Sequence, residues 1–163
     1  MSAAGQALYR SRQVWHALRP VIDTTELAEA CAILSEEEAR IFFSMQPRDQ
    51  RHALEVTHRL RQMGVEEHAL LIAALLHDCG KGAVPVWLRI AWVAAPGLVR
   101  KVAREDAPGM RGAAYRLIYH PSLGASRVEA AGASATTVRL IAGKALPSEE
   151  TLAVLLRTAD DQS

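Results

Sequence analysis

The chain has 163 residues, of which half are apolar and 23% are charged, and its formal net charge is +1. This length fits one compact domain with a core large enough to fold without disulfides or a structural metal. The balanced charge gives no support for wholesale nucleic-acid binding, because that function normally shows as a strong basic excess. We therefore expect a globular protein with no nucleic-acid partner.

The cysteines and the N-terminal residues indicate a reducing compartment. Cys31 and Cys79 show neither metal-ligand nor disulfide-framework spacing. Residues 1–20 contain no apolar segment of the kind that a secretory signal requires. The sequence thus predicts a cytoplasmic location.

Helix signals dominate the chain, whereas strand signals are scarce, so the sequence predicts an all-α, compact single-domain helical bundle. Residues 1–45 read as a helical N-terminal extension packed on the same domain, which itself covers 46–163. Ser35 and Glu38 form a capping box ahead of an apolar run. The helices expected after it cover about 47–63, 66–78, 84–95, 97–105, 110–118, 122–132, 134–142 and 148–159, with Pro96, Pro108, Pro121 and Pro147 as breaks.

One apolar stretch, residues 83–99, is too short and too interrupted by prolines and Arg89 to span a bilayer, so no membrane span is expected. The stretch reads as a buried helix followed by a loop. Its tryptophans, Trp87 and Trp92, keep open the alternative of a membrane-surface or partner-binding element.

The segment LLIAALLHDCGKG carries the main chemical signal. A helix that is apolar on every side is buried, and His77 and Asp78 stand at its end. An ionised carboxylate in such a place is costly unless a partner compensates its charge. A metal ion would do so, and the glycines that follow would leave room for one. The alternative is a solvated Asp78 beside a hydrogen-bonded core histidine.

Two further side chains are expected to face the core, a direction that suits a metal ligand but also, for the histidine, a hydrogen-bonded core residue. His52 falls at the edge of the apolar face of the helix over about 47–63, whereas His58 points to solvent. Asp160 follows Leu156 by four residues and faces the core, whereas Asp161 faces solvent. Two histidines and two carboxylates make a plausible mixed nitrogen and oxygen site for a metal.

The order His52, His77-Asp78, Asp160 resembles the H…HD…D signature of the HD superfamily of metal-dependent phosphohydrolases. RHALEVTHRL around His52 looks like that family's first helix, and the segment from His120 to Ala125, HPSLGA, is similar to its HPEIGA-type segment. The likeness covers residues 51–160. It implies an HD-type helical bundle and a hydrolase.

The resemblance also implies roles. His52, His77, Asp78 and Asp160 would bind one divalent metal (Mn, Fe, Co, Ni, Zn or Mg). Asp78 would in addition accept a proton from water, and Lys81 would lie near the substrate phosphate or brace Asp78. His120 corresponds to a histidine that binds a second metal in binuclear members and contacts phosphate in others. The catalytic candidates are therefore Asp78, Lys81 and His120.

The sequence departs from the binuclear cyclic-dinucleotide phosphodiesterases of the HD-GYP type. Those enzymes have further histidines after the HPEIGA-like helix, where this chain reads VRLIAGKAL, and a GYP-like motif is missing. These departures favour a single metal and argue against a cyclic dinucleotide as substrate.

The expected reaction is hydrolysis of a nucleotide or other small phosphate ester by water that the metal activates, since a bound divalent ion can lower the pKa of water to about 7. Further cations could neutralise phosphate charge: Lys144, Arg100, Arg104, Arg111 and Arg116. One alternative is a non-catalytic metal- or nucleotide-binding signalling module with the same fold. Another is a di-iron oxygenase, which would need core histidines that His16, His58 and His68 are not placed to supply. The substrate and the oligomeric state stay open, a homodimer being one option.

Overall fold

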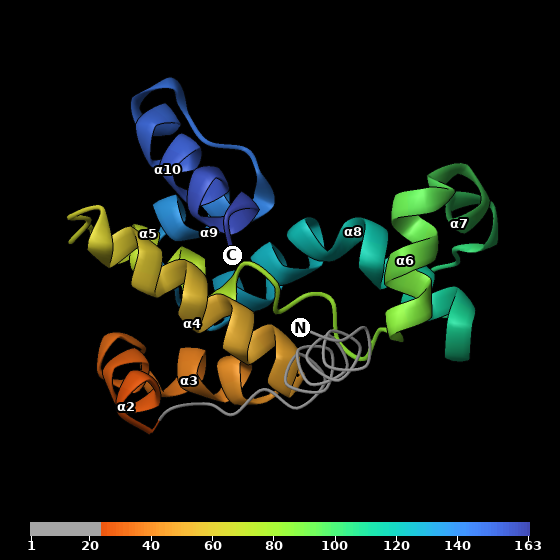
Figure 1. Cartoon of the computed structure of the whole chain (residues 1–163), viewed down its shortest axis with the longest axis horizontal. Helices are drawn as coiled ribbons and strands as arrows, with labels where there is room; N and C mark the ends of the chain where they lie inside the picture. Colours follow the sequence, from red (N-terminus) through yellow and green to blue (C-terminus); the bar gives the residue numbers. More distant parts are fainter. Residues whose placement is uncertain (1–23) are drawn as a thin grey trace, which may run out of the picture.

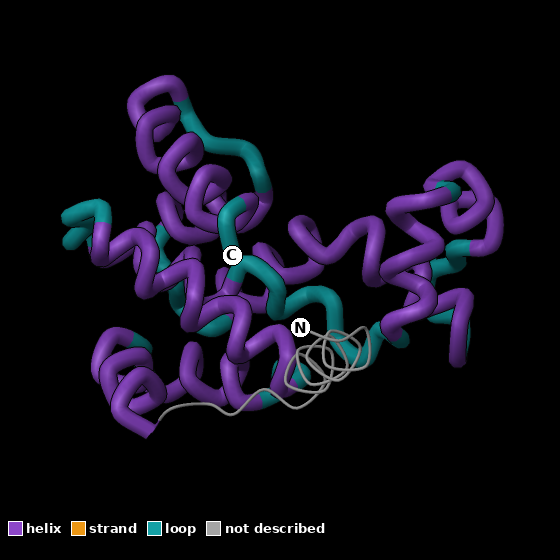
Figure 2. The backbone as a smooth tube through the Cα atoms, viewed as in Figure 1, coloured by secondary structure: helices purple, strands orange, loops and turns teal. Residues whose placement is uncertain are grey.

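The computed structural model describes residues 24–163, apart from the side chains of Thr24 and Glu26. Every regular element in this part of the chain is helical (Figures 1 and 2). The α-helices are α2 (Thr24–Ile33), α3 (Glu36–Phe43), α4 (Pro47–Gln62), α5 (His68–Leu76), α6 (Val86–Ala94), α7 (Pro96–Val102), α8 (Gly109–Ala130), α9 (Ala135–Ala142) and α10 (Glu150–Asp161), and η1 (Pro147–Glu149) is a 3-10 turn. The all-α prediction is confirmed.

Helix α5 lies at the centre of the bundle. Seven consecutive residues, from Leu70 to Leu76, are buried, and the helix contacts α2, α3, α4, α9 and α10. Because α5 is apolar on every side, it is stable only where neighbouring helices surround it. The C-terminal end of this central helix therefore delivers the His77-Asp78 pair into the interior.

The N-terminal helices α2 and α3 complete the core around α5. Ala30, Leu34, Phe42 and Met45 are all buried in the same cluster as the α5 residues. Ser35 and Glu38 form the expected capping box, in which each side chain accepts a hydrogen bond from the other residue's backbone. Residues 24–45 thus pack on the bundle, while residues 1–23 of the expected extension lie outside the described residues.

Helix α8 corrects one prediction, because it runs unbroken from Gly109 to Ala130 with Pro121 inside it. The expectation of two separate helices with a break at Pro121 is wrong. Proline has no N–H, so the carbonyl of Leu117 loses its helical partner. The Nδ1–H of His120 donates to this carbonyl instead, at 2.9 Å. A side chain thus supplies the hydrogen bond that the proline removes.

Helices α6 and α7 and the start of α8 form an arm, residues 84–114, at the far end of the molecule from α2 and α10 (Figure 1). The arm has a small core of its own, made of Val84, Leu88, Val99, Ala113, Ala114 and Leu117 of the adjoining α8 turn. Helix α6 buries only Leu88, so the expectation of a buried helix here is wrong. No helix within residues 24–163 is long and apolar enough to cross a bilayer.

The linkage between α9 and η1 predicts a specific acid sensitivity. The Arg139 guanidinium, with its Nε 2.9 Å from Oε2 of Glu149, and the backbone N–H of Leu146 lower the pKa of Glu149 to about 2. Because the folded-state pKa lies below the ordinary value of 4.5, this contribution to stability is present above that value and is lost as the pH falls towards about 2.

We therefore expect Glu149→Gln to lower the free energy of unfolding near neutral pH, with a deficit that shrinks as the pH falls from about 4.5 to about 2. Urea denaturation of both proteins across this range measures the difference. A deficit that stays constant with pH would show that the ion pair is not its source.

Candidate metal centre

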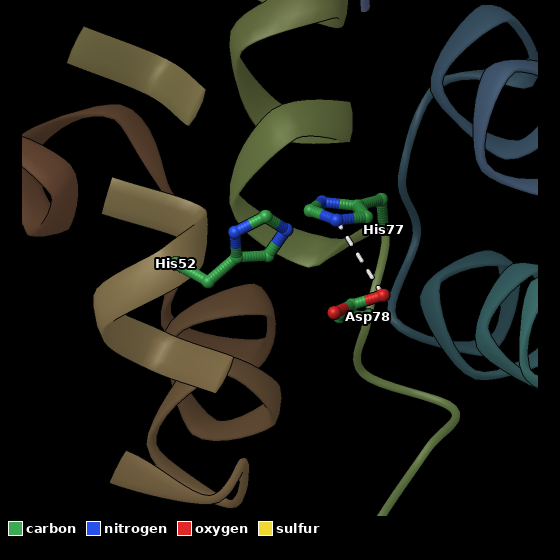
Figure 3. A group of neighbouring side chains, drawn as sticks. All are labelled: His52, His77 and Asp78. Atoms are coloured by element: carbon green, nitrogen blue, oxygen red, sulfur yellow. Dashed lines mark ion pairs between the residues drawn. The ribbon is translucent and has the colours of Figure 1, made fainter. Parts of the chain in front are cut away.

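Four helices deliver side chains to one place beside the end of α5. His52 comes from α4, His77 and Asp78 from the turn after α5, His120 from α8, and Asp160 from the last turn of α10. Figure 3 shows His52, His77 and Asp78 facing one another across this space. The arrangement follows from local sequence, because each residue lies on the apolar side or at the buried end of its helix.

The donor atoms are close together. One donor atom from each of His52, His77 and Asp78 lies within 4.8 Å of the other two. The Nε2 of His77 is 3.4 Å from Oδ1 of Asp78 and 3.5 Å from Oδ1 of Asp160. His52 donates from Nε2 to the same Oδ1 of Asp160 at 2.8 Å. The structure therefore brings together all four residues that the sequence singled out as ligands.

Two buried atoms in this cluster make no hydrogen bond within residues 24–163: Nε2 of His77 and Oδ1 of Asp78. The other ring nitrogen of His77 donates to the carbonyl of Ala74 at 2.9 Å. When the ring is neutral and carries its proton on Nδ1, His77 directs the lone pair of Nε2 at the carboxylate oxygen. A positive charge at this point, either a proton on Nε2 or a metal ion, would compensate the buried carboxylate.

The pKa shifts of His77, Asp78 and Asp160 show how strongly these charged groups interact. Burial alone would lower the pKa of His77, but the carboxylates of Asp78 and Asp160 outweigh burial and raise it. Burial would raise the pKa of Asp78, but the charges of His77 and Lys81 outweigh burial and lower it. The imidazoles of His52 and His77 hold the pKa of Asp160 well below its usual range. The two carboxylates thus favour a positive charge on the imidazoles beside them.

Lys81 and His120 border the cluster, each beside a different oxygen of Asp78. The ammonium of Lys81 binds Oδ2 of Asp78 at 2.5 Å, so Lys81 braces this carboxylate and leaves Oδ1 directed at the histidines. The Nε2 of His120 lies 3.7 Å from that Oδ1. Burial and the charge of Lys81 lower the pKa of His120. His120 is therefore neutral near pH 7 and presents a lone pair to the site.

Comparison with protein families decides the classification. The family model described as HD domain matches residues 50–160, about two thirds of the chain. The chain belongs to the HD-domain family. HD domains form a superfamily of metal-dependent phosphohydrolases, and the His52, His77 and Asp78 cluster is able to hold a divalent metal. No significant match to a curated protein or to a solved structure is found.

The donor set of this HD domain fits such a metal. Imidazole nitrogens and carboxylate oxygens are the ligands that divalent first-row metals accept. The hydrogen bond from His77 Nδ1 to the Ala74 carbonyl is the kind of outer contact that fixes the orientation of a ligating histidine. The unpartnered Nε2 and Oδ1 atoms are the positions at which coordination would replace the missing hydrogen bonds.

The turn after α5, which carries His77 and Asp78, is held against α8 by close backbone packing. A Cβ atom on Gly80 would lie 2.2 Å from the carbonyl oxygen of His120, so only glycine fits there. Arg127 of α8 donates to the carbonyl of Cys79 at 2.6 Å and to Oγ of Ser44 at 3.0 Å. One arginine thus connects the His-Asp turn with the residue that follows α3.

Two cavities border the site. The larger, of about 510 Å³, is lined by His52, Asp78 and Lys81 together with residues of α4 and α6: Arg48, Asp49, Arg51, Glu55 and Arg89, and by Ser163. The second, of about 360 Å³, borders His77, His120 and Asp160 and is mostly apolar elsewhere. The first cavity is lined by charged side chains of both signs, whereas the second is rich in aliphatic side chains.

Sequence reasoning missed the α4 and α6 residues that line the larger cavity. Arg89 donates to Asp49 at 2.9 Å, and both side chains are largely buried. Arg48 and Asp49 lie one helical turn before His52 in α4. The helical period could therefore have shown that they share a face with His52. Their pairing with Arg89 depends on the placement of α6, which the sequence does not give.

Several residues that the sequence offered as candidates lie elsewhere. None of Lys144, Arg100, Arg104, Arg111 and Arg116 lines either cavity. Arg116 donates to the carbonyls of Lys81 and Ala83, so its role is to hold the turn. His58 and His68 are exposed, as expected, and His16 lies outside the described residues.

Pro121 predicts a measurable effect on His120. In Pro121→Ala the new backbone N–H competes for the Leu117 carbonyl, which now binds Nδ1 of His120. We expect the helix to persist and His120 to lose its preference for a proton on Nδ1. Imidazole ¹⁵N chemical shifts measure the tautomer directly. Unchanged shifts would show that another contact fixes the ring.

Proposed function

We propose that this HD domain hydrolyses a nucleotide or another small phosphate ester in a metal-dependent reaction. The observation that carries the proposal is the buried pair of unpartnered atoms, His77 Nε2 and Asp78 Oδ1, 3.4 Å apart. A purely structural His-Asp pair would form a hydrogen bond there. This pair instead leaves both atoms directed into a space that His52, His120 and Asp160 also border.

His52, His77, Asp78 and Asp160 are the residues that would hold one divalent ion. When bound, such an ion polarises a phosphoryl oxygen and lowers the pKa of water to about 7. The membership of the family supports a metal of this kind, although it leaves its identity among Mn, Fe, Co, Ni, Zn and Mg. The two imidazole nitrogens in the donor set favour a transition metal over Mg²⁺.

The chain's own groups divide the remaining tasks. Asp78 is ionised because Lys81 and the histidines lower its pKa, so its carboxylate is able to accept a proton from the attacking water. Lys81 fixes the orientation of that carboxylate through Oδ2. His120, whose lowered pKa keeps it neutral, presents the lone pair of Nε2 beside Oδ1 of Asp78 and is able to accept a hydrogen bond there.

The larger cavity carries four cationic side chains beside its acids and fits the phosphate end of the substrate. Arg48 and Arg51 lie on the turn of α4 before His52, and Lys81 closes the same cavity from the other side. Arg48 forms no ion pair within residues 24–163 in the structure, which leaves its guanidinium available for a phosphate oxygen. A volume of about 510 Å³ accommodates a small ester.

The alternative is a non-catalytic metal- or nucleotide-binding module. The four ligand candidates are all present and converge, which favours catalysis over a binding role. A di-iron oxygenase is disfavoured because His58 and His68 are exposed and do not reach the site.

The test is a panel of phosphate monoesters and diesters assayed with protein loaded with each metal. We expect turnover with at least one substrate, and a loss of at least about a thousandfold in Asp78→Ala, because this change removes a ligand and the proton acceptor together. Asp161→Ala is the matched control, since Asp161 is exposed on the same helix end as Asp160. Activity that survives in Asp78→Ala would contradict the mechanism. Metal binding without turnover on any substrate would favour the binding module.

A further inference from the structure

The outward side of α6 is apolar. Val86, Ile90 and Val93 are 44%, 63% and 84% exposed, and at about 100° per residue they fall within roughly 60° of one another around the helix. Trp87 continues this surface and is 54% exposed. Arg89 does not interrupt it, because its guanidinium binds Asp49. A solvent-facing side without a polar residue is unusual for a helix at the edge of a bundle.

The rest of the arm carries more exposed apolar side chains. Leu98 and Val102 of α7 and Met110 at the start of α8 are 65%, 37% and 48% exposed. Seven of the twelve exposed large apolar residues in the described part of the chain lie between Val86 and Met110. The arm projects at one end of the molecule (Figure 1). Such a concentration indicates an interaction surface.

The charge of the arm selects among partners. Residues 84–114 contain five arginines and lysines and only two acids, Glu105 and Asp106. The arm therefore has a net charge of +3, against +1 for the whole chain. Lys101 and Arg111 are exposed, and Arg100 lies over the ring of Trp92 at 5.2 Å. The apolar surface is thus bordered by cations.

We propose that the arm binds the surface of an anionic lipid bilayer, with the outward side of α6 inserted among the acyl chains near the headgroups. Aliphatic and tryptophan side chains beside lysines and arginines are the composition of helices that lie in this interface. The cations gain from the negative potential of the lipid headgroups. The short helices of the arm lie on the bilayer and do not cross it.

A second copy of the chain is the other occupant to consider. A two-fold symmetric contact through α6 would bring equivalent arginines and lysines of both copies together. Like charges at such an interface cost free energy, whereas anionic headgroups neutralise them. The charge of the arm therefore favours a bilayer, and this inference does not depend on the proposed phosphohydrolase activity.

The experiment is vesicle flotation with the full chain. We expect at least about tenfold more protein on vesicles of phosphatidylcholine with about 30% phosphatidylglycerol than on phosphatidylcholine alone, with binding that weakens as salt rises. Ile90→Ser/Val93→Ser should lower binding by at least about tenfold. Lys101→Gln/Arg111→Gln should lower it about fivefold for each charge removed.

Leu146→Ser/Val154→Ser is the matched control, because both residues are 47% exposed and lie outside the arm. It should bind as the unaltered protein does, and circular dichroism should show equal helix content in all variants. Three results would overturn the proposal: equal binding to neutral vesicles, binding that survives in Ile90→Ser/Val93→Ser, or no binding at all. A dimer in light scattering that Ile90→Ser/Val93→Ser dissociates, without vesicle binding, would assign the surface to a second copy.

Discussion

Replacing His77 with alanine is expected to lower the affinity for a divalent metal by at least about a hundredfold. Loss of a residue that only orients a metal ligand lowers metal affinity by up to about that factor. His77 is itself a candidate ligand, so its loss should cost at least as much. Its Nε2 faces carboxylate oxygens of both Asp78 and Asp160. Calorimetric titration with Mn²⁺ or Zn²⁺ measures the change.

The same variant should also lose most of the stabilisation that the metal confers. A ligand present at a hundred times its dissociation constant stabilises the folded state by about 2.7 kcal/mol, which appears as a metal-dependent rise in Tm. His58→Ala is the control, because His58 is exposed on α4 and its ring hydrogen-bonds with Gln62 of the same helix. If His77→Ala kept the affinity of the unaltered protein, the site would have to lie elsewhere.

Gly80→Ala should cause the largest loss of stability of any conservative change in the turn. The added Cβ would lie 2.2 Å from the carbonyl oxygen of His120 and 2.6 Å from the backbone nitrogen of Gly124. Both neighbours are backbone atoms of α8, so neither can rotate away. We expect a loss of about 3 kcal/mol in the free energy of unfolding and a displacement of His120 from Asp78.

Gly97→Ala is the comparison for this change. Gly97 lies in α7 and is exposed, and a Cβ atom added to it would meet no other atom within 4 Å. There, alanine should be neutral or stabilise the helix by up to about 1 kcal/mol. Urea denaturation of both variants measures the two changes in the free energy of unfolding. A Gly80→Ala protein as stable as Gly97→Ala would mean that α8 moves away from the turn at little cost.

The helical fold and the inward direction of the site residues could be predicted because both depend on local periodicity, and the resemblance to HD domains implied that these residues meet. The spacing of apolar residues places His52 at the edge of the α4 core face and Asp160 on the inner side of α10. The structure joins these two side chains across 108 residues of sequence. Their role as metal ligands stays a prediction that the titration above tests.

Other features depend on how helices are placed, which periodicity does not determine. Helices α5 and α6 are both largely apolar in sequence, so their hydrophobic patterns look alike. Neighbouring helices surround α5, whereas they cover only one side of α6. Pro121 reads as a break in the sequence because the compensating hydrogen bond comes from a side chain. The Arg89 and Asp49 pair joins two helices whose relative placement only the three-dimensional structure gives.

Arg127 has a consequence for where a shortened protein could safely begin. The family match starts at residue 50, yet Arg127 ties the Cys79 carbonyl to Ser44, which precedes that point. Phe42 and Ala30, also upstream, are 0% and 2% exposed. A fragment cut to the matched span would expose one side of α5. It would also remove Ser44, one of the two hydrogen-bond acceptors of the Arg127 guanidinium. The cooperative unit that positions His77 and Asp78 therefore starts well before the recognisable family segment.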